Sequence, residues 1–438
     1  MNYLYCGDNL GAVKEYNVNE IFKKDSGSTS SATEVSRCEA KVVTFISFGN
    51  NFESFKQGET EGLNQFDIYI GYSDGLVEIY DGPFVSNSRI SKAKIKVSGE
   101  VVFIQDVSKN YINQVELGNK AVLIVTNLMR LYILRIPQLN FQSNMSSKTT
   151  INSLTSENDL EIGSKYIINS IELPGTNVSC VAYNNINNSI AYGGYESDVK
   201  LFSLKNNCIY WSCKNVHANM LRHRVPVDVT KIIFLSESAQ VLLSGTGFGE
   251  IRIYSPNSQK RPLVNFDLWN DKLPVTSLVV IKNWDQYEYK SNINTYSCLL
   301  AVGNNKGSTL IVKIVYGKEK KIKTSTINER RKSALSSRKV VPFVEKSFNN
   351  DVIGLKKDSK FDFKESYKIE LSVIGSFKGI IGGIRSMICF KAGVFENENA
   401  NVVAISGPGR NIYLFDIKKR KLIKKIFTSQ KISFMIVV

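Results

Sequence analysis

A hairpin-like pattern recurs along the chain and limits its fold more than any other feature. Each copy has a short apolar run, a glycine or small residue, a polar turn, and an alternating run that ends in an aromatic or aliphatic residue. The clear copies are LYCGDNLGAVKEYN from Leu4, IYIGYSDGLVEIYD from Ile68, AYGGYESDVKLFSL from Ala191, LLSGTGFGEIRIYSP from Leu242, LAVGNNKGSTLIVKI from Leu300 and AISGPGRNIYLFDI from Ala404. A weaker copy, LIVTNLMRLYILRI from Leu123, has Thr126 in place of the glycine.

These seven copies predict seven antiparallel hairpins, because the second run alternates as a half-buried strand does. Gly, Asn and Asp supply the positive φ that tight turns need. Such hairpins match the inner pair of strands in a WD-type blade, and seven blades close a ring. We therefore predict an all-β fold, a seven-bladed WD40-type β-propeller. Its repeats are degenerate, because Tyr80-Asp81 and Phe415-Asp416 are the nearest forms of the Trp-Asp signature.

The two ends of the sequence predict how the ring closes. The chain starts almost inside its first hairpin, and it ends with ISFMIVV, an apolar run with no hairpin after it. Pairing of this C-terminal strand with the N-terminal blade would satisfy two otherwise free sheet edges. We expect residues 1–438 to form a single seven-bladed β-propeller, with flexible insertions at about 24–37, 141–165 and 317–370.

The charge balance favours a polyanionic partner. The chain has 56 basic and 40 acidic residues, a net charge of +16, which suits nucleic acid or acidic protein surfaces. A solvated basic surface without a ligand is the alternative. The seven cysteines are scattered and form no CxxC, as expected of reduced thiols. Without a signal-peptide pattern or a membrane-length apolar run, we expect a soluble intracellular protein with no membrane partner.

Motifs for catalysis are scarce. The chain has two histidines, His217 and His223, and contains neither an HExxH motif nor a Walker GxxxxGK[ST] loop. The glycine-rich GSFKGIIGG near Gly375 is explained by strand turns. We expect a protein that is not an enzyme, with no cofactor, metal site or small-molecule substrate. An active site of dispersed carboxylates remains an alternative.

A basic stretch within residues 317–346 is the first candidate interface. It carries ten basic and three acidic residues and could bind RNA phosphates or act as a nuclear import signal. A solvated loop with neither role is the alternative. The basic residues considered are Lys320, Lys321, Lys323, Arg330, Arg331, Lys332, Arg338 and Lys339. A second cluster, KKRKLIKK at 418–425, suits an outer edge strand, where Lys discourages aggregation.

The second candidate interface is WSCKNVHANMLRHRVPVD, residues 211–228, between two predicted blades. The segment is too polar for a strand. Its last residues should be extended, because Pro226 fixes its own φ and restricts the residue before it to extended geometry. It reads as an ordered basic loop on one propeller face or as a structural linker. The candidate partner- or RNA-binding residues are Lys214, Asn215, Val216, Arg222, Arg224, Val225 and Pro226.

This segment resembles one protein family. KNV followed by RVPV, directly after a YGG…KLF blade, is similar to the nucleolar WD-repeat assembly factors of the large ribosomal subunit. In words, these are the WD repeat-containing protein seventy-four and Nop-seven-associated factor family. GTGFGEIRIYSPNSQKRPLVNF resembles the family's following blade, and RNIYLFDIKKRKLIKKIFTSQKISFMIVV its closing one. The residues that match the family segment are Lys214, Asn215, Val216, Leu221, Arg224, Val225 and Pro226.

The resemblance implies a non-catalytic scaffold. It implies docking on pre-rRNA and neighbouring assembly factors in pre-60S particles, and a location in the nucleus and nucleolus. It also implies an AAA-type ATPase that releases the protein and an exosome-linked RNA helicase as partners. The chain departs from the family at Asn219, Arg222 and Asp228, so the charge offered to a partner there has changed. A generic WD40 adaptor, such as a ubiquitin-ligase substrate receptor, is the alternative.

Overall fold

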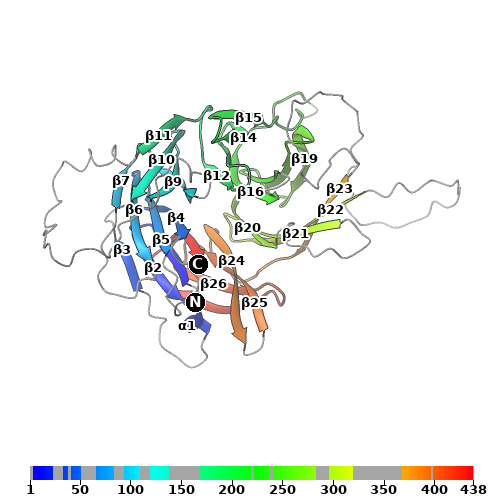
Figure 1. Cartoon of the computed structure of the whole chain (residues 1–438). Helices are drawn as coiled ribbons and strands as arrows, with labels where there is room; N and C mark the ends of the chain where they lie inside the picture. The colour runs from blue at the N-terminus through cyan, green and yellow to red at the C-terminus, as the bar shows by residue number, and fades with distance from the viewer. Residues whose placement is uncertain are drawn as a thin grey trace, which may run out of the picture.

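Seven four-stranded antiparallel sheets stand around a common axis and form a β-propeller (Figure 1). The fold is known from a computed structural model. It describes residues 3–22, 33–37, 41–50, 66–82, 93–108, 119–137, 167–218, 221–236, 240–282, 295–318, 367–395 and 398–437. One short helix, α1 (Val18–Phe22), follows the third strand of the first blade. The predicted seven-bladed all-β propeller is confirmed.

The blades are numbered here from the N-terminus, with the strands of each given from the axis outward. Blades one to four are β28 (Ile432–Val437), β1 (Tyr3–Asp8), β2 (Ala12–Asn17), β3 (Thr33–Arg37); β4 (Val43–Asn50), β5 (Phe66–Tyr72), β6 (Leu76–Gly82), β7 (Ala93–Lys96); β8 (Val101–Asp106), β9 (Asn119–Thr126), β10 (Arg130–Pro137), β11 (Ile167–Glu172); β12 (Cys180–Asn184), β13 (Ser189–Gly194), β14 (Ser197–Ser203), β15 (Cys208–Ser212). Blades five to seven are β16 (Val229–Ser236), β17 (Val241–Thr246), β18 (Glu250–Ser255), β19 (Gln259–Asp267); β20 (Val275–Lys282), β21 (Thr295–Asn304), β22 (Thr309–Lys318), β23 (Tyr367–Gly375); β24 (Ser386–Phe395), β25 (Glu398–Ser406), β26 (Asn411–Asp416), β27 (Lys421–Phe427).

The innermost strand of each blade contacts the innermost strand of the next, so β28, β4, β8, β12, β16, β20 and β24 form the inner wall. Each hairpin found in the sequence supplies the second and third strands of its blade. These are the inner two of the four strands, as the sequence pattern predicts, and one further strand lies between each hairpin and the axis.

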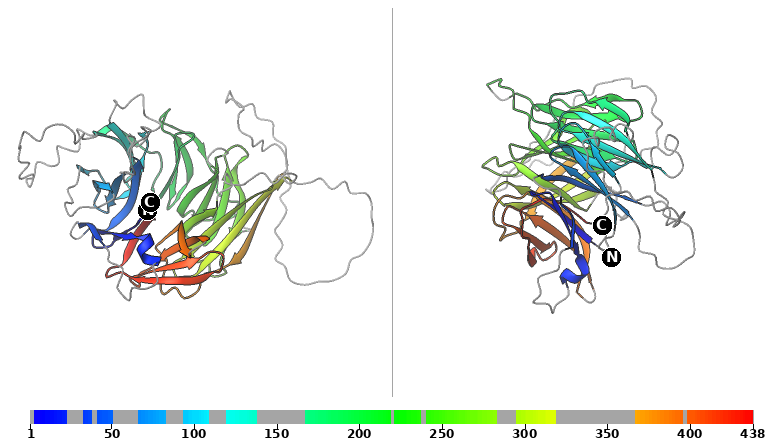
Figure 2. Two further views of the ribbon diagram at one scale, coloured as in Figure 1. Left: turned by 60° about the horizontal axis from the view of Figure 1, so that its bottom comes forward. Right: turned by 90° about the vertical axis from the view of Figure 1, so that its left-hand side faces the viewer.

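The C-terminal strand closes the ring as predicted. β28 pairs antiparallel with β1, from Leu4 opposite Val437 to Asp8 opposite Ile432. The two ends of the chain therefore lie side by side (Figure 1, Figure 2). The Ser433 hydroxyl on β28 donates to the Val43 carbonyl in blade two over 2.6 Å. The closing strand thus belongs to blade one and also bonds to the next blade.

In most hairpins, an aliphatic side chain from the next blade packs against a glycine. A Cβ on Gly245 would lie 2.6 Å from Val275 Cγ1, where blade six begins. The matching pairs are Gly7 with Val43, Gly71 with Val101, Gly193 with Val229, and Gly303 with Ile384. The positive φ of the turn falls later in the chain, as at Gly249 (φ 77°). The first glycine therefore serves contact between blades, and the second serves the turn.

A hydroxyl beside this aliphatic residue adds a bond between blades. Thr230 Oγ1, next to Val229, donates to the Val275 carbonyl of blade six over 2.6 Å. Ser179 Oγ donates to the Val229 carbonyl in the same way over 2.8 Å. Each bond provides a donor for a carbonyl at the start of an inner strand. That carbonyl faces the joint between two blades, where a buried carbonyl needs a hydrogen-bond partner.

Two of the expected insertions are shorter than predicted. The stretch 24–37 contains β3, and the stretch 317–370 begins within β22 and ends within β23. The residues of β3 and β23 read as loop because an outermost strand has one neighbour and needs little apolar sequence, and residues 317–318 are the end of β22. Residues 141–165 lie outside the described part of the chain, as do residues 319–366. The basic cluster at 418–425 reaches into β27, the predicted outer strand of its blade.

Gly245→Ala is expected to lower the free energy of unfolding by about 1–3 kcal/mol, because its Cβ would overlap Val275. Urea unfolding of the full chain measures this. Combining it with Val275→Ala, which removes the overlapping methyl groups, should cost less than the sum of the two single changes. Strictly additive effects would contradict the contact between blades.

Candidate partner-binding face

One face of the propeller carries all connections between blades. Strand direction alternates within a blade, so the turn between its second and third strands lies at the same end as the exit to the next blade. We call this end the crossing face. The remaining connections, from first to second and from third to fourth strand, lie on the opposite face.

Residues 213–228 connect β15 to β16 and therefore lie on the crossing face. Backbone bonds hold both ends of the segment. The Lys214 N–H donates to the Lys260 carbonyl over 2.8 Å, and the Glu196 N–H donates to the Val227 carbonyl over 2.9 Å. The segment is thus docked against blade five at its start and against the blade-four turn at its end.

Asn215 joins the two sides of the segment at its base. Its Nδ2 donates to the Val225 carbonyl over 2.6 Å, and its Oδ1 accepts from Arg252 Nη1 over 3.0 Å. The Asn215 carbonyl accepts from Arg261 Nη1 over 2.6 Å. Arg252 is 2% exposed and pairs with Glu250 at 2.6 Å. Asn215 and Val225 therefore hold the segment in shape, and their contact with a partner stays a prediction.

The tip of the segment points away from these anchors. Leu221 is 74% exposed, the most exposed of the large apolar side chains in the described part of the chain. Arg222, with φ 60°, and Arg224 are exposed beside it, and Arg224 reaches Asp198 only at 4.0 Å. Among the other candidates, Lys214 and Pro226 are exposed and Val216 is half-buried. The tip therefore offers two guanidinium groups around one apolar side chain.

Other exposed apolar side chains lie around the same face. They are Leu10, Leu128 and Tyr195 in hairpin turns, and Ile381 in the connection between blades six and seven. They come from different blades, and single exposed apolar side chains of this kind are common on protein surfaces.

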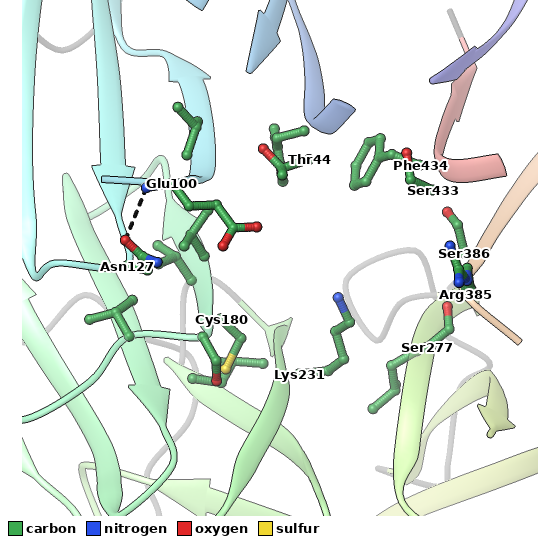
Figure 3. Close-up of a pocket in the computed structure, with 18 of the residues that line it drawn as sticks. Thr44, Glu100, Asn127, Cys180, Lys231, Ser277, Arg385, Ser386, Ser433 and Phe434 are labelled. Carbon is green, nitrogen blue, oxygen red and sulfur yellow. Dashed lines mark hydrogen bonds between the residues drawn. The ribbon is translucent and has the colours of Figure 1, made fainter. Parts of the chain in front are cut away.

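A cavity of about 570 Å³ opens at the centre of the crossing face, between the first residues of the inner strands (Figure 3). One wall is aromatic, because the Phe434 and Phe45 rings contact each other in a tilted arrangement with centroids 4.8 Å apart. The other wall is polar and consists of Cys180, Lys231, Ser277 and Ser386. The ring of blades therefore has a centre with two chemically different halves.

Three charged residues line this cavity, Lys231, Glu100 and Arg385. The Lys231 ammonium extends into the opening, and the Glu100 carboxyl enters from across it (Figure 3). Burial lowers the pKa of Lys231 and raises the pKa of Glu100. Within the described residues, no carboxylate lies within ion-pair distance of Lys231. Lys231 and Glu100 are thus partly desolvated and not paired with each other.

Sequence reasoning missed this cavity, although a signal for it exists. A three-residue pattern starts every inner strand: an aliphatic residue that packs on the previous blade, a second residue that is usually Thr or Ser, and a variable third residue. The copies are Val43-Thr44-Phe45, Val101-Val102-Phe103, Val178-Ser179-Cys180, Val229-Thr230-Lys231, Val275-Thr276-Ser277, Ile384-Arg385-Ser386 and Ile432-Ser433-Phe434. The third positions line the cavity in six of the seven blades.

The basic candidates of the other predicted interface lie outside the described residues. They are Lys320, Lys321, Arg330, Arg331, Lys332, Arg338 and Lys339. The strand ends that flank them, Lys318 of β22 and Tyr367 of β23, lie on the face opposite the crossing face. The two predicted interfaces therefore start from opposite faces of the propeller.

The described residues contain no group of three His, Cys, Asp or Glu side chains placed to hold a metal ion. No helix in that part of the chain is long and apolar enough to cross a membrane.

No protein-family profile matches the chain. Ribosome biogenesis protein NSA1 of Meyerozyma guilliermondii is 22% identical to it over 258 residues, which is 56% of this chain and 50% of that protein. The chain resembles a ribosome biogenesis factor. This similarity confirms the resemblance predicted from the sequence motifs, and the chain spans about half the length of the NSA1 relative.

Asn215→Ala is expected to destabilise the fold by about 1–3 kcal/mol, because it removes the bonds that Asn215 makes to Arg252 Nη1 and to the Val225 carbonyl. It should also speed tryptic cleavage at Arg222 and Arg224, since the base of their loop opens. Lys214→Ala, at the exposed neighbour, is the control for both measurements. Equal cleavage rates in the two variants would show that Asn215 does not hold the segment.

Proposed function

We propose that the protein is a non-catalytic scaffold of large ribosomal subunit biogenesis. It docks on pre-rRNA and neighbouring assembly factors within nucleolar pre-60S particles. The observation that carries this proposal is the similarity to NSA1. The propeller supports it, because a rigid ring of turns presents recognition residues at low conformational entropy cost.

The crossing face has the chemistry for both kinds of partner. Arg222 and Arg224 at the segment tip can neutralise RNA phosphates, and Lys214 lies near the base of the same segment. Leu221 and the apolar turn residues can pack against an assembly factor. The net charge of +16 favours association with a particle rich in RNA.

The basic stretch at 320–339 would act from the other face. Its lysines and arginines would bind rRNA phosphates or direct nuclear import, and its flanking strands leave the propeller opposite the crossing face. The protein could then bridge two components of the particle, one at each face.

The remaining partners of the proposal come from the sequence resemblance. They are an AAA-type ATPase that releases the protein from the particle and an exosome-linked RNA helicase. The proposal includes no membrane and no small-molecule substrate.

A second function is a WD40 adaptor, for example a ubiquitin-ligase substrate receptor. The central cavity favours it, because a protein side chain fits such a space without any RNA. Salt dependence separates the two functions. Binding to RNA releases counterions, so its affinity falls steeply as the salt concentration rises, whereas binding of a peptide does not require such a fall.

The test is affinity purification of the tagged protein from its own cells, with sequencing of the RNA that co-purifies. Precursors of large-subunit rRNA together with large-subunit assembly factors are expected. Arg222→Glu with Arg224→Glu should lower recovered rRNA by on the order of tenfold, because two phosphate contacts become repulsive. Lys205→Glu with Lys418→Glu makes the same charge change at turns of the opposite face. A ligase scaffold without rRNA would refute the proposal.

Replacing Arg330, Arg331 and Lys332 with Gln tests the basic stretch separately. The logarithm of the affinity for a single-stranded RNA decreases with the logarithm of the salt concentration. The magnitude of this slope should decrease by about 2, in proportion to the charges removed. Fluorescence microscopy of the same tagged variant reports nuclear import. No change in either measurement would show that the stretch is only solvated.

A further inference from the structure

We propose that the central cavity is a docking site for one acidic side chain of a protein partner, delivered beside an apolar residue. The carboxylate would bind the Lys231 ammonium, and the apolar neighbour would pack on Phe45 and Phe434. The inference rests on the proposed function only in taking the partner to be another assembly factor.

The polar wall supplies the first part of the argument. Lys231 is half-buried on β16, and its ammonium faces the opening between Cys180 and Ser277 of the adjoining blades (Figure 3). A partly desolvated ammonium is stabilised when a carboxylate arrives with it. The described residues supply no such carboxylate, so a ligand can provide it.

The aromatic wall supplies the second part. The Phe45 ring makes tilted contacts with the rings of Phe434 and Phe103, with centroids 4.8 and 5.2 Å away, across three consecutive blades. Phe45 and Phe434 remain only partly buried and line the cavity. An apolar or aromatic side chain placed there would remove their exposed ring faces from water.

Glu100 sets the orientation of the ligand. Its carboxyl enters the cavity from blade three, across from Lys231 (Figure 3). A second acidic group on that side would meet like charge, whereas a backbone N–H would meet an acceptor. The cavity therefore discriminates between the two directions in which an extended peptide could enter.

These groups fit a protein better than RNA. A nucleic-acid backbone presents successive phosphates and is bound by several cations in a row. The cavity has two cationic residues, Lys231 and Arg385, rather than a row of them, together with an opposed carboxyl and an aromatic wall. A volume of about 570 Å³ accepts a few side chains, as peptide and ligand pockets do.

The test is selection of a phage-displayed library of random peptides on the purified full chain. Peptides with one Asp or Glu next to an apolar residue are expected to be enriched. Lys231→Met keeps the bulk of the side chain and removes its charge, and it should weaken a selected peptide by at least about thirtyfold. Lys378→Met, at an exposed lysine of the crossing face outside the cavity, should leave binding unchanged.

Ser277→Glu is the second variant, since it places a carboxylate in the cavity itself and should also abolish binding. Thermal unfolding checks that each variant is folded.

No enrichment of acidic peptides, or equal binding by wild type and Lys231→Met, would overturn the inference. Loss of binding to a single-stranded RNA in Lys231→Met would overturn it in favour of a phosphate site. Purification without pre-60S components would refute the proposed function and leave these peptide measurements standing.

Discussion

An aliphatic side chain packed on a bare glycine Cα forms most joints between blades. Val275 on Gly245 shows the geometry, and the same contact recurs from Gly7 to Gly303. The contact needs both partners, because any side chain on the glycine would push the blades apart. The Thr or Ser beside the aliphatic residue adds a hydrogen bond at several joints, as Thr230 does. Spacing between blades, and therefore the width of the ring, follows from this contact.

The same short pattern connects stability to recognition. Its first residue packs on the previous blade, its second often bonds to the next blade, and its third faces the cavity. The third position is free to vary because it is not needed for the joint. Phe45, Lys231 and Ser277 occupy equivalent places in three blades and give the cavity its unlike walls. A propeller can in this way change its central site while its ring stays closed.

The sequence predicted the features that depend on neighbouring residues. The seven hairpins follow from alternation and turn glycines, and the closing strand follows from one unpaired apolar run. Features that depend on which individual side chains meet in the fold could not be predicted. Asn215 reads as a binding residue until its bond to Arg252 is known, and Lys231 reads as an ordinary strand residue until the ring places it at the axis. β3 was missed because an outer strand has a polar sequence.

Pairing of β28 with β1 joins residues more than four hundred positions apart in the sequence. A ribosome that makes this chain exposes β1 first and must synthesise more than four hundred further residues before the partner strand emerges. Until then, the edge of β1 lacks its neighbour and the Gly7 joint lacks the Ser433 bonds. Such an edge invites pairing with other chains. The nascent protein therefore remains an open arc until β28 has been synthesised, and only then can it close into a ring.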